Sequence, residues 1–308
     1  MVERGFLTKL WRMTSAADRL ALAVLLALIV LASLGKRPSS QLLGTMLVVF
    51  AGMLALPILG ARSRTWRVVH ELSPIGWVPV LFNLCGPTIV ALNPARWDAA
   101  LVESDAYLFG GLVHAWRNLL GRPDWLTDLA SVAYGSFYFV PMAVAFTHYL
   151  RKDMAEYGRS ILAIQLAFYL PFIGYFAMPA LGPRVPAAEE AAVLGGGAIS
   201  AGLRAFLRAG EVNVLDAFPS GHTSVSVTSL ILAWRSLPRS RALFAVWCTS
   251  IVFSTVYLSL HYVTDLAAGI AVAVVSVAIV SPLGARLGLD VKAARAKRSP
   301  ASPLRVEC

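Results

Sequence analysis

The fold class is decided by residues 263–282, which read VTDLAAGIAVAVVSVAIVSP. After three residues this segment is apolar for long enough to cross the roughly 30 Å hydrocarbon core of a bilayer, which takes a helix of about 20 residues. The whole chain has the same character, with 57% hydrophobic and 14% charged residues among 308. A soluble domain of this length needs more polar surface. We therefore expect an all-α polytopic membrane protein.

Eight apolar segments are predicted to span the membrane. They are residues 18–35, 41–60, 72–92, 127–149, 159–181, 221–237, 241–260 and 263–282. If the N-terminus is cytoplasmic, 19 of the 27 Lys and Arg residues fall on the inner side. Because cytoplasmic loops carry excess positive charge, this asymmetry predicts that both termini are cytoplasmic. The first segment is short and follows basic residues, so a cleaved signal peptide is an alternative that leaves the later orientation unchanged.

The net charge of +10 lies in short basic clusters between apolar segments, which is typical of membrane topology signals rather than of nucleic-acid binding. The basic tail, residues 283–308, is predicted to be cytoplasmic, as a topology signal or an anionic-lipid contact. Cys85, Cys248 and Cys308 are scattered and form no disulfide or metal-binding pattern. We expect an integral protein of the plasma membrane with no nucleic-acid partner. The sequence does not indicate an oligomeric state.

Three polar patches interrupt the apolar pattern, and the predicted topology puts all three on the outer side. They read PALGPRVP at 179–186, PSGHTS at 219–224 and LHYVTDLAAG at 260–269. In the second patch, a helix that begins near Pro219 leaves its first backbone N–H groups unpaired. These groups and the positive end of the helix dipole favour an anion such as phosphate, which Gly221 lets approach the backbone. An ordinary helix cap with an interfacial His222 is the alternative.

The third patch strengthens the functional interpretation. His261 and Asp265 are four residues apart, so on a helix they share a face and can hydrogen-bond. A carboxylate on one imidazole nitrogen fixes the tautomer and makes the other nitrogen a better nucleophile. Ionisable pairs inside a membrane protein are costly and usually functional. A solvated pair at the headgroup level and a metal site are the alternatives, and the latter lacks further ligands at suitable spacing.

The chain resembles the type 2 phosphatidic acid phosphatase superfamily, whose pattern is K-x6-R-P, then P-S-G-H, then S-R-x5-H-x3-D. The matching residues are Pro219, Ser220, Gly221, His222, Ser254, His261 and Asp265. The resemblance implies a six-helix catalytic core over residues 66–282, which follows an N-terminal segment with two added spans, residues 1–65. It also implies an enzyme without cofactor or metal that acts on membrane lipids.

Departures from the pattern point to one branch of that family. Thr255 stands where the third motif has Arg, Ala177 stands where the first motif has Lys, and Arg184 lies in a variant GPR. In these respects the chain is similar to the inositol-phosphorylceramide and sphingomyelin synthase branch. A phosphodiester carries one negative charge, whereas a phosphomonoester carries between one and two. A pocket with fewer cations therefore favours a phosphodiester donor.

The resemblance implies a two-step phosphoryl transfer. His261 attacks phosphorus, Asp265 stabilises the imidazolium, and His222 serves as acid and then as base. The phosphate is held by Ser220, Gly221 and Arg184. The acceptor is a lipid alcohol such as ceramide or diacylglycerol in a transferase, and water in a lipid-phosphate phosphatase, which is the alternative. A non-catalytic protein that binds or transports anionic lipids is an alternative from another class.

Two long outer loops remain. Residues 93–126 mix apolar and charged residues, which predicts short helices lying in the membrane interface. Asp98 and Asp105 in this loop either orient it or are simply solvated. Residues 182–220 are predicted to be either a substrate lid or a linker lying on the membrane.

Overall fold

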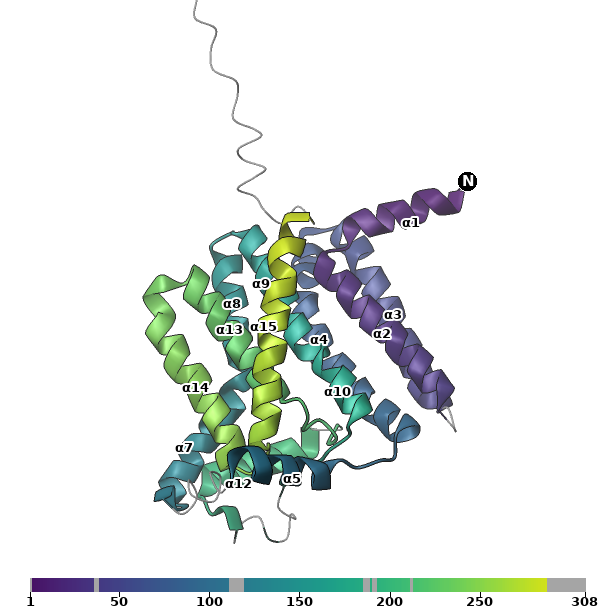
Figure 1. The fold of residues 1–308 in the computed structure, drawn as a ribbon. Helices are drawn as coiled ribbons and strands as arrows, with labels where there is room; N and C mark the ends of the chain where they lie inside the picture. Colours follow the sequence, from purple (N-terminus) through teal and green to yellow (C-terminus); the bar gives the residue numbers. More distant parts are fainter. Residues whose placement is uncertain are drawn as a thin grey trace, which may run out of the picture.

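All eight apolar segments become helices in the structure, a computed structural model that describes residues 2–35, 39–110, 119–184, 189, 193–210 and 213–286. No strand occurs in these ranges. The basic tail beyond residue 286 lies outside them, as do parts of both outer loops. Figure 1 shows long helices packed side by side, with shorter helices across both ends of the bundle.

Seven helical segments of the described chain are long and apolar enough to cross a membrane. They are α2 (Ala16–Leu34), α3 (Ser40–Gly60), α4 (Arg64–Leu92), α7 (Asp124–Gly135) with α8 (Phe139–Leu150), α9 (Met154–Tyr169) with α10 (Pro171–Ala177), α14 (Arg241–Tyr257) and α15 (Val263–Arg286). The predicted span at 221–237 forms α13 (Gly221–Ser236), whose 16 residues rise about 24 Å and which is not among these seven segments. The prediction of an all-α polytopic membrane protein is thus confirmed, with seven candidate spans in the described chain rather than eight.

Proline breaks two of the predicted spans. The segment predicted at 159–181 begins earlier, at Met154, where the Asp153 side chain accepts the Glu156 N–H as an N-cap. It is divided into α9 and α10 at Pro171, which lacks an N–H for the helix and fits the first position of a new one. The span predicted at 127–149 is divided by the 3₁₀ turn Ser136–Tyr138, shortly before Pro141.

Helix α13 lies at the centre of the bundle, where it packs against α8, α9, α14 and α15. Its polar residues Ser224, Ser226, Thr228 and Ser229 are all buried. The Ser224 hydroxyl donates to the Ala167 carbonyl of α9 at 2.9 Å. Small residues let helices approach closely inside a membrane. The polar character of this span therefore reflects contact with other helices rather than exposure to lipid.

Helices α2 and α3 form a hairpin on one side of the bundle, against α4 and α9 (Figure 1). Their position agrees with the predicted N-terminal addition, although the domain boundary at residue 65 stays a prediction. A buried pair joins the hairpin to α4, with His70 Nε2 2.9 Å from Asp18 Oδ2. The same Asp18 caps its own helix through Ser15.

Both outer loops contain helices that lie across one end of the bundle. These are α5 (Asp98–Phe109) and α12 (Ala198–Gly210), while α1 (Val2–Met13) lies at the opposite end (Figure 1). Helix α5 confirms the prediction of a short helix in the first loop. Helix α12 is amphipathic, and its Leu203 and Leu207 pack against a cluster that includes Tyr134 and Tyr257.

Candidate active site

The structure brings the three polar patches together at the end of the bundle that α5 and α12 cover. The rings of His222 and His261 face each other with centroids 5.7 Å apart and planes inclined by 60°. The Ser220 backbone N–H donates to the Asp265 carbonyl at 3.0 Å, which joins the start of α13 to the first turn of α15. Two imidazoles at this separation can both contact one bound phosphoryl group.

His261 is positioned by a tight turn between α14 and α15. The backbone N–H groups of Leu260 and His261 both donate to the Thr255 carbonyl, at 2.9 and 3.1 Å. Ser259 in this turn has a φ of 59°. His261 thus precedes α15, which begins at Val263, and does not lie on the same helix as Asp265 as its spacing predicted.

The hydrogen bonds of His261 define its tautomer. Its Nδ1 lies 3.0 Å from the Ala217 carbonyl oxygen and 3.3 Å from Asp265 Oδ2. Both neighbours are acceptors, so Nδ1 carries the proton and Nε2 keeps its lone pair. The expected His–Asp contact is therefore present, with a backbone carbonyl as a second partner that sequence reasoning did not find.

Asp265 is completely buried. Its Oδ2 also accepts the Tyr262 backbone N–H at 2.8 Å, so the carboxylate holds both the ring of His261 and the backbone that follows it. Among the described residues, Asp265 Oδ1 has no hydrogen-bond partner. A carboxylate fixed in this way stabilises an imidazolium at its neighbour.

Helix α13 starts at the site with a regular N-cap. Ser220, itself buried, accepts the Thr223 N–H on its hydroxyl at 3.2 Å. Gly269 allows α15 to approach this helix start, because a Cβ there would come within 2.6 Å of the Ser220 carbonyl oxygen. The close contact leaves the first turn of α13, with Gly221 and His222, at the wall of a cavity.

The His222 ring lies between aromatic rings. It stacks on Tyr134 with centroids 4.4 Å apart, and the Phe137 ring lies 4.2 Å away. Both aromatic residues come from the span that was predicted at 127–149. They also fix the orientation of a candidate acid–base group.

Arg184 belongs to the site through its charge and is paired there. Its Nη2 lies 3.3 Å from Asp216 Oδ1, and the charge also acts on His222. The loop that carries Arg184 is held against the His261 turn, since Gly182 has a φ of +82° and a Cβ on it would collide with the Leu260 carbonyl oxygen. Asp216 was missed by sequence reasoning, because no local pattern shows that this acid pairs with Arg184.

Helix α5 holds the site from outside through two carboxylates. Asp98 Oδ1 accepts the backbone N–H groups of Leu181 and Gly182, both at 3.0 Å, just before Arg184. It also lies 3.5 Å from the Tyr262 hydroxyl. Burial and this nearby acid raise the pKa of Tyr262, which keeps its hydroxyl protonated as a donor. Of the two interpretations left open for Asp98, orientation of the loops is therefore the correct one.

Asp105 caps the helix that carries Asp265. Its carboxylate accepts the Val263 N–H at 2.9 Å, the Thr264 N–H at 2.7 Å and the Thr264 hydroxyl at 2.5 Å. Helix α15 thus receives its N-terminal cap from a residue about 160 positions earlier in the chain. This carboxylate also orients the site rather than being merely solvated.

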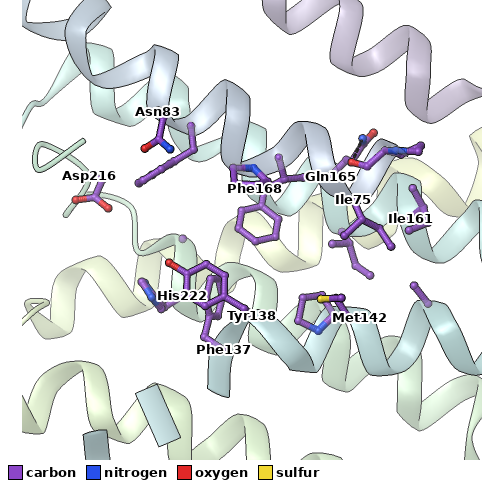
Figure 2. Close-up of a pocket in the computed structure, with 18 of the residues that line it drawn as sticks. Ile75, Asn83, Phe137, Tyr138, Met142, Ile161, Gln165, Phe168, Asp216 and His222 are labelled. Carbon is purple, nitrogen blue, oxygen red and sulfur yellow. Dashed lines mark hydrogen bonds between the residues drawn. The ribbon is translucent and has the colours of Figure 1, made fainter. Parts of the chain in front are cut away.

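A cavity of about 350 Å³ extends from His222 into the bundle (Figure 2). Asp216, Gly221 and His222 line its polar end, and Ile75, Met142 and Ile161 line its apolar end. Helices α4, α8 and α9 form most of the wall. A polar end at His222 and an apolar interior suit a molecule with a phosphate head and a hydrocarbon chain.

Several other candidate residues have different places. Thr255, at the Arg position of the third motif, is buried and uses its hydroxyl within its own helix. Ala177, at the Lys position of the first motif, is exposed. His70 and His148 pair with Asp18 and Ser236 at the other end of the bundle. In the described ranges no three His, Cys, Asp or Glu gather as metal ligands.

Comparison with known proteins assigns the family. A family model described as the PAP2 superfamily matches residues 99–279, more than half of the chain. Neither a curated protein nor a solved structure matches the chain. The matched range includes Arg184, His222, His261 and Asp265. The chain therefore belongs to the PAP2 superfamily, the type 2 phosphatidic acid phosphatases and their relatives.

Proposed function

We propose that the protein is a lipid phosphotransferase that works through a phosphohistidine intermediate. The observation that carries this proposal is the paired histidine centre. His261 has Nδ1 occupied by two acceptors and Nε2 free, and the His222 ring lies 5.7 Å away. A nucleophile fixed by a carboxylate and facing an acid–base group is the arrangement that covalent phosphoryl transfer requires.

The reaction proceeds in two displacements. In the first, His261 Nε2 forms a bond to phosphorus while the bond from phosphorus to the lipid oxygen breaks, and His222 protonates the departing alkoxide. In the second, His222 removes the proton from the acceptor hydroxyl, whose oxygen attacks phosphorus and releases His261. Asp265 stabilises the imidazolium formed in between. Arg184 and the helix start at Ser220 and Gly221 contact the non-bridging oxygens.

The donor is proposed to be a phosphodiester lipid, and the acceptor a lipid alcohol such as ceramide or diacylglycerol. Asp216 offsets the charge of Arg184 at 3.3 Å, so the site has little net positive charge for a doubly charged monoester. This supports placing the protein near the inositol-phosphorylceramide and sphingomyelin synthase branch. The apolar cavity supplies room for a hydrocarbon chain.

The enzyme is proposed to lie in the plasma membrane with its site on the outer side. The distribution of 19 inner and 8 outer basic residues supports this orientation, as does the position of the site at the end opposite to α1. Both termini are then cytoplasmic.

One experiment tests the reaction directly. Purified protein is incubated with phosphorus-labelled phosphatidic acid, phosphatidylinositol or a polyprenyl diphosphate, with and without ceramide or diacylglycerol. A labelled new lipid that requires the acceptor supports the transferase, whereas free labelled phosphate supports a monoester phosphatase instead.

The matched control is His261→Ala. The wild-type protein is expected to trap label as acid-labile phosphohistidine after rapid quenching, and the variant none. If the wild type releases no product and forms no phosphoenzyme with any donor, the enzyme proposal fails and a lipid-binding role replaces it.

A further inference from the structure

Tyr175 is a polar residue in an apolar helix, and its side chain reaches the site. It lies on α10, where it is only 2% exposed, whereas Ala177 two residues later is exposed. Its ring packs beside Phe172, with centroids 5.9 Å apart. The phenol hydroxyl is therefore held in one place by the surrounding core rather than being free to rotate into lipid.

The Tyr175 hydroxyl lies at the first residue of α13. A Cβ built on Gly221 would be only 2.8 Å from the hydroxyl oxygen, so the phenol lies directly beside the first turn of α13. A phenol has an O–H to donate. The Tyr175 hydroxyl thus adds a side-chain donor beside the backbone N–H groups at the start of α13.

The cavity indicates which groups the Tyr175 hydroxyl can contact. Tyr175, Gly221, His222 and Asp216 all line it. The guanidinium of Arg184 is shared with Asp216 at 3.3 Å. A phosphoryl group bound next to His222 therefore meets one offset cation and one neutral, buried hydroxyl donor, and in a dry site such a donor is effective.

We propose that Tyr175 is a phosphate-binding catalytic residue, whose hydroxyl donates to a non-bridging oxygen of the transferred phosphoryl group. The inference rests on the proposed function in that the ligand is the phosphoryl group of a lipid. It adds Tyr175 to the proposed phosphate site and a preference for singly charged ligands. A neutral donor beside an offset cation suits the single charge of a phosphodiester better than the double charge of a monoester.

The test compares two buried tyrosines. Tyr175→Phe removes the proposed donor. Tyr169→Phe is the matched control, because Tyr169 is 5% exposed, packs against the same Phe172 and has a buried hydroxyl without a partner among the described residues. Both variants lose one oxygen from the same hydrophobic cluster, so a general effect on folding appears in both thermal melting curves.

Binding is measured in detergent by calorimetry with dimethyl phosphate, a singly charged diester, and with inorganic phosphate. We expect wild type and Tyr169→Phe to bind dimethyl phosphate equally and more tightly than inorganic phosphate, and Tyr175→Phe to bind it about tenfold more weakly. With a short-chain phospholipid donor, we expect kcat/KM of Tyr175→Phe to fall about a hundredfold.

The binding experiment tests the assignment of Tyr175, and the transfer experiment tests the proposed reaction, so one can fail without the other. Unchanged dimethyl phosphate binding by Tyr175→Phe, or no binding of either ion by the wild type, overturns the assignment of Tyr175. Weaker binding by Tyr175→Phe together with no turnover by the wild type leaves the Tyr175 contact standing and removes the proposed transfer reaction.

Discussion

At the scale of single residues, the two histidines of the site differ in their surroundings. His261 is hydrogen-bonded at Nδ1 by Ala217 and Asp265, so its other nitrogen is a fixed nucleophile. His222 is enclosed by the rings of Tyr134 and Phe137, which hold an imidazole without supplying a counter-charge. The ring is thus held in one orientation, from which, in the proposed reaction, it gives a proton to the departing lipid oxygen and later accepts one from the acceptor.

Replacing Asp265 by Asn tests the fixed tautomer. The amide can donate to Nδ1 and shift the ring proton to Nε2, which removes the attacking lone pair. We expect the rate of phosphoenzyme formation, measured by rapid quench with a labelled donor, to fall by roughly a hundredfold to ten-thousandfold. A variant that forms phosphohistidine at the wild-type rate contradicts the role given to Asp265.

Replacing Asp216 by Asn tests the charge of the phosphate site. Arg184 then loses the carboxylate 3.3 Å away and presents its full charge to the ligand. We expect the ratio of kcat/KM for a phosphomonoester to that for a phosphodiester to rise roughly tenfold. Asp216→Glu, which keeps the negative charge, serves as the control. An unchanged ratio in Asp216→Asn shows that this pair does not set the preference.

The candidate catalytic residues could be found from the sequence because their chemistry is concentrated in short motifs. PSGH and the H-x3-D spacing located His222, His261 and Asp265. Asp216 and Tyr175 could not be found in this way, since an acid in a loop and a tyrosine in an apolar helix become functional only through residues that are distant in sequence.

At the scale of elements, α5 lies across one end of the bundle and fixes two neighbouring segments through its carboxylates (Figure 1). Asp98 holds the backbone that leads to Arg184, and Asp105 caps α15. Two catalytic segments are thus fixed by one interfacial helix. Asp128 of α7 has a comparable role for α12, since its carboxylate accepts the Gly197 and Ser200 N–H groups at 2.9 and 3.0 Å.

Removing the contact between Asp105 and the start of α15 is expected to change both stability and turnover. Asp105→Ala leaves the first N–H groups of α15 without their cap, which is expected to lower the free energy of unfolding by about 1–2 kcal/mol and to reduce kcat by displacing Asp265. Glu103→Ala, an exposed acid on the same helix, is the control. Thermal melting and turnover are measured together. A lower melting temperature with unchanged kcat shows that Asp105 stabilises the fold without positioning the site.

The sequence predicted the existence of the helices better than their limits. Hydropathy located all eight apolar segments because each must satisfy its backbone inside the bilayer. The division at Pro171 and the early start of α4 at Arg64 depend on local capping, which a hydropathy window does not detect. The partners of Asp98 and Asp105 lie more than 80 residues away, so no local pattern could identify them.

At the scale of the whole molecule, the arrangement joins the candidate site at one end of the bundle to an apolar interior. The cavity leads from His222 to Ile161 along α9, toward the end of the bundle that carries α1. A hydrocarbon chain can remain among apolar side chains while its phosphate reaches the histidines. In the proposed reaction, the orientation of the protein decides which leaflet supplies the donor.

Orientation is tested with two single-cysteine variants and an impermeant maleimide. Glu103→Cys lies on α5 beside the site, and Arg239→Cys lies in the 3₁₀ turn Pro238–Ser240 at the other end of α13; both positions are exposed. Cys85 and Cys248 can remain because they are buried, and Cys308 is replaced by Ser. The excess of inner basic residues predicts that Glu103→Cys is labelled in intact cells and Arg239→Cys only after lysis. The reverse pattern places the site in the cytoplasm, with donors drawn from the inner leaflet.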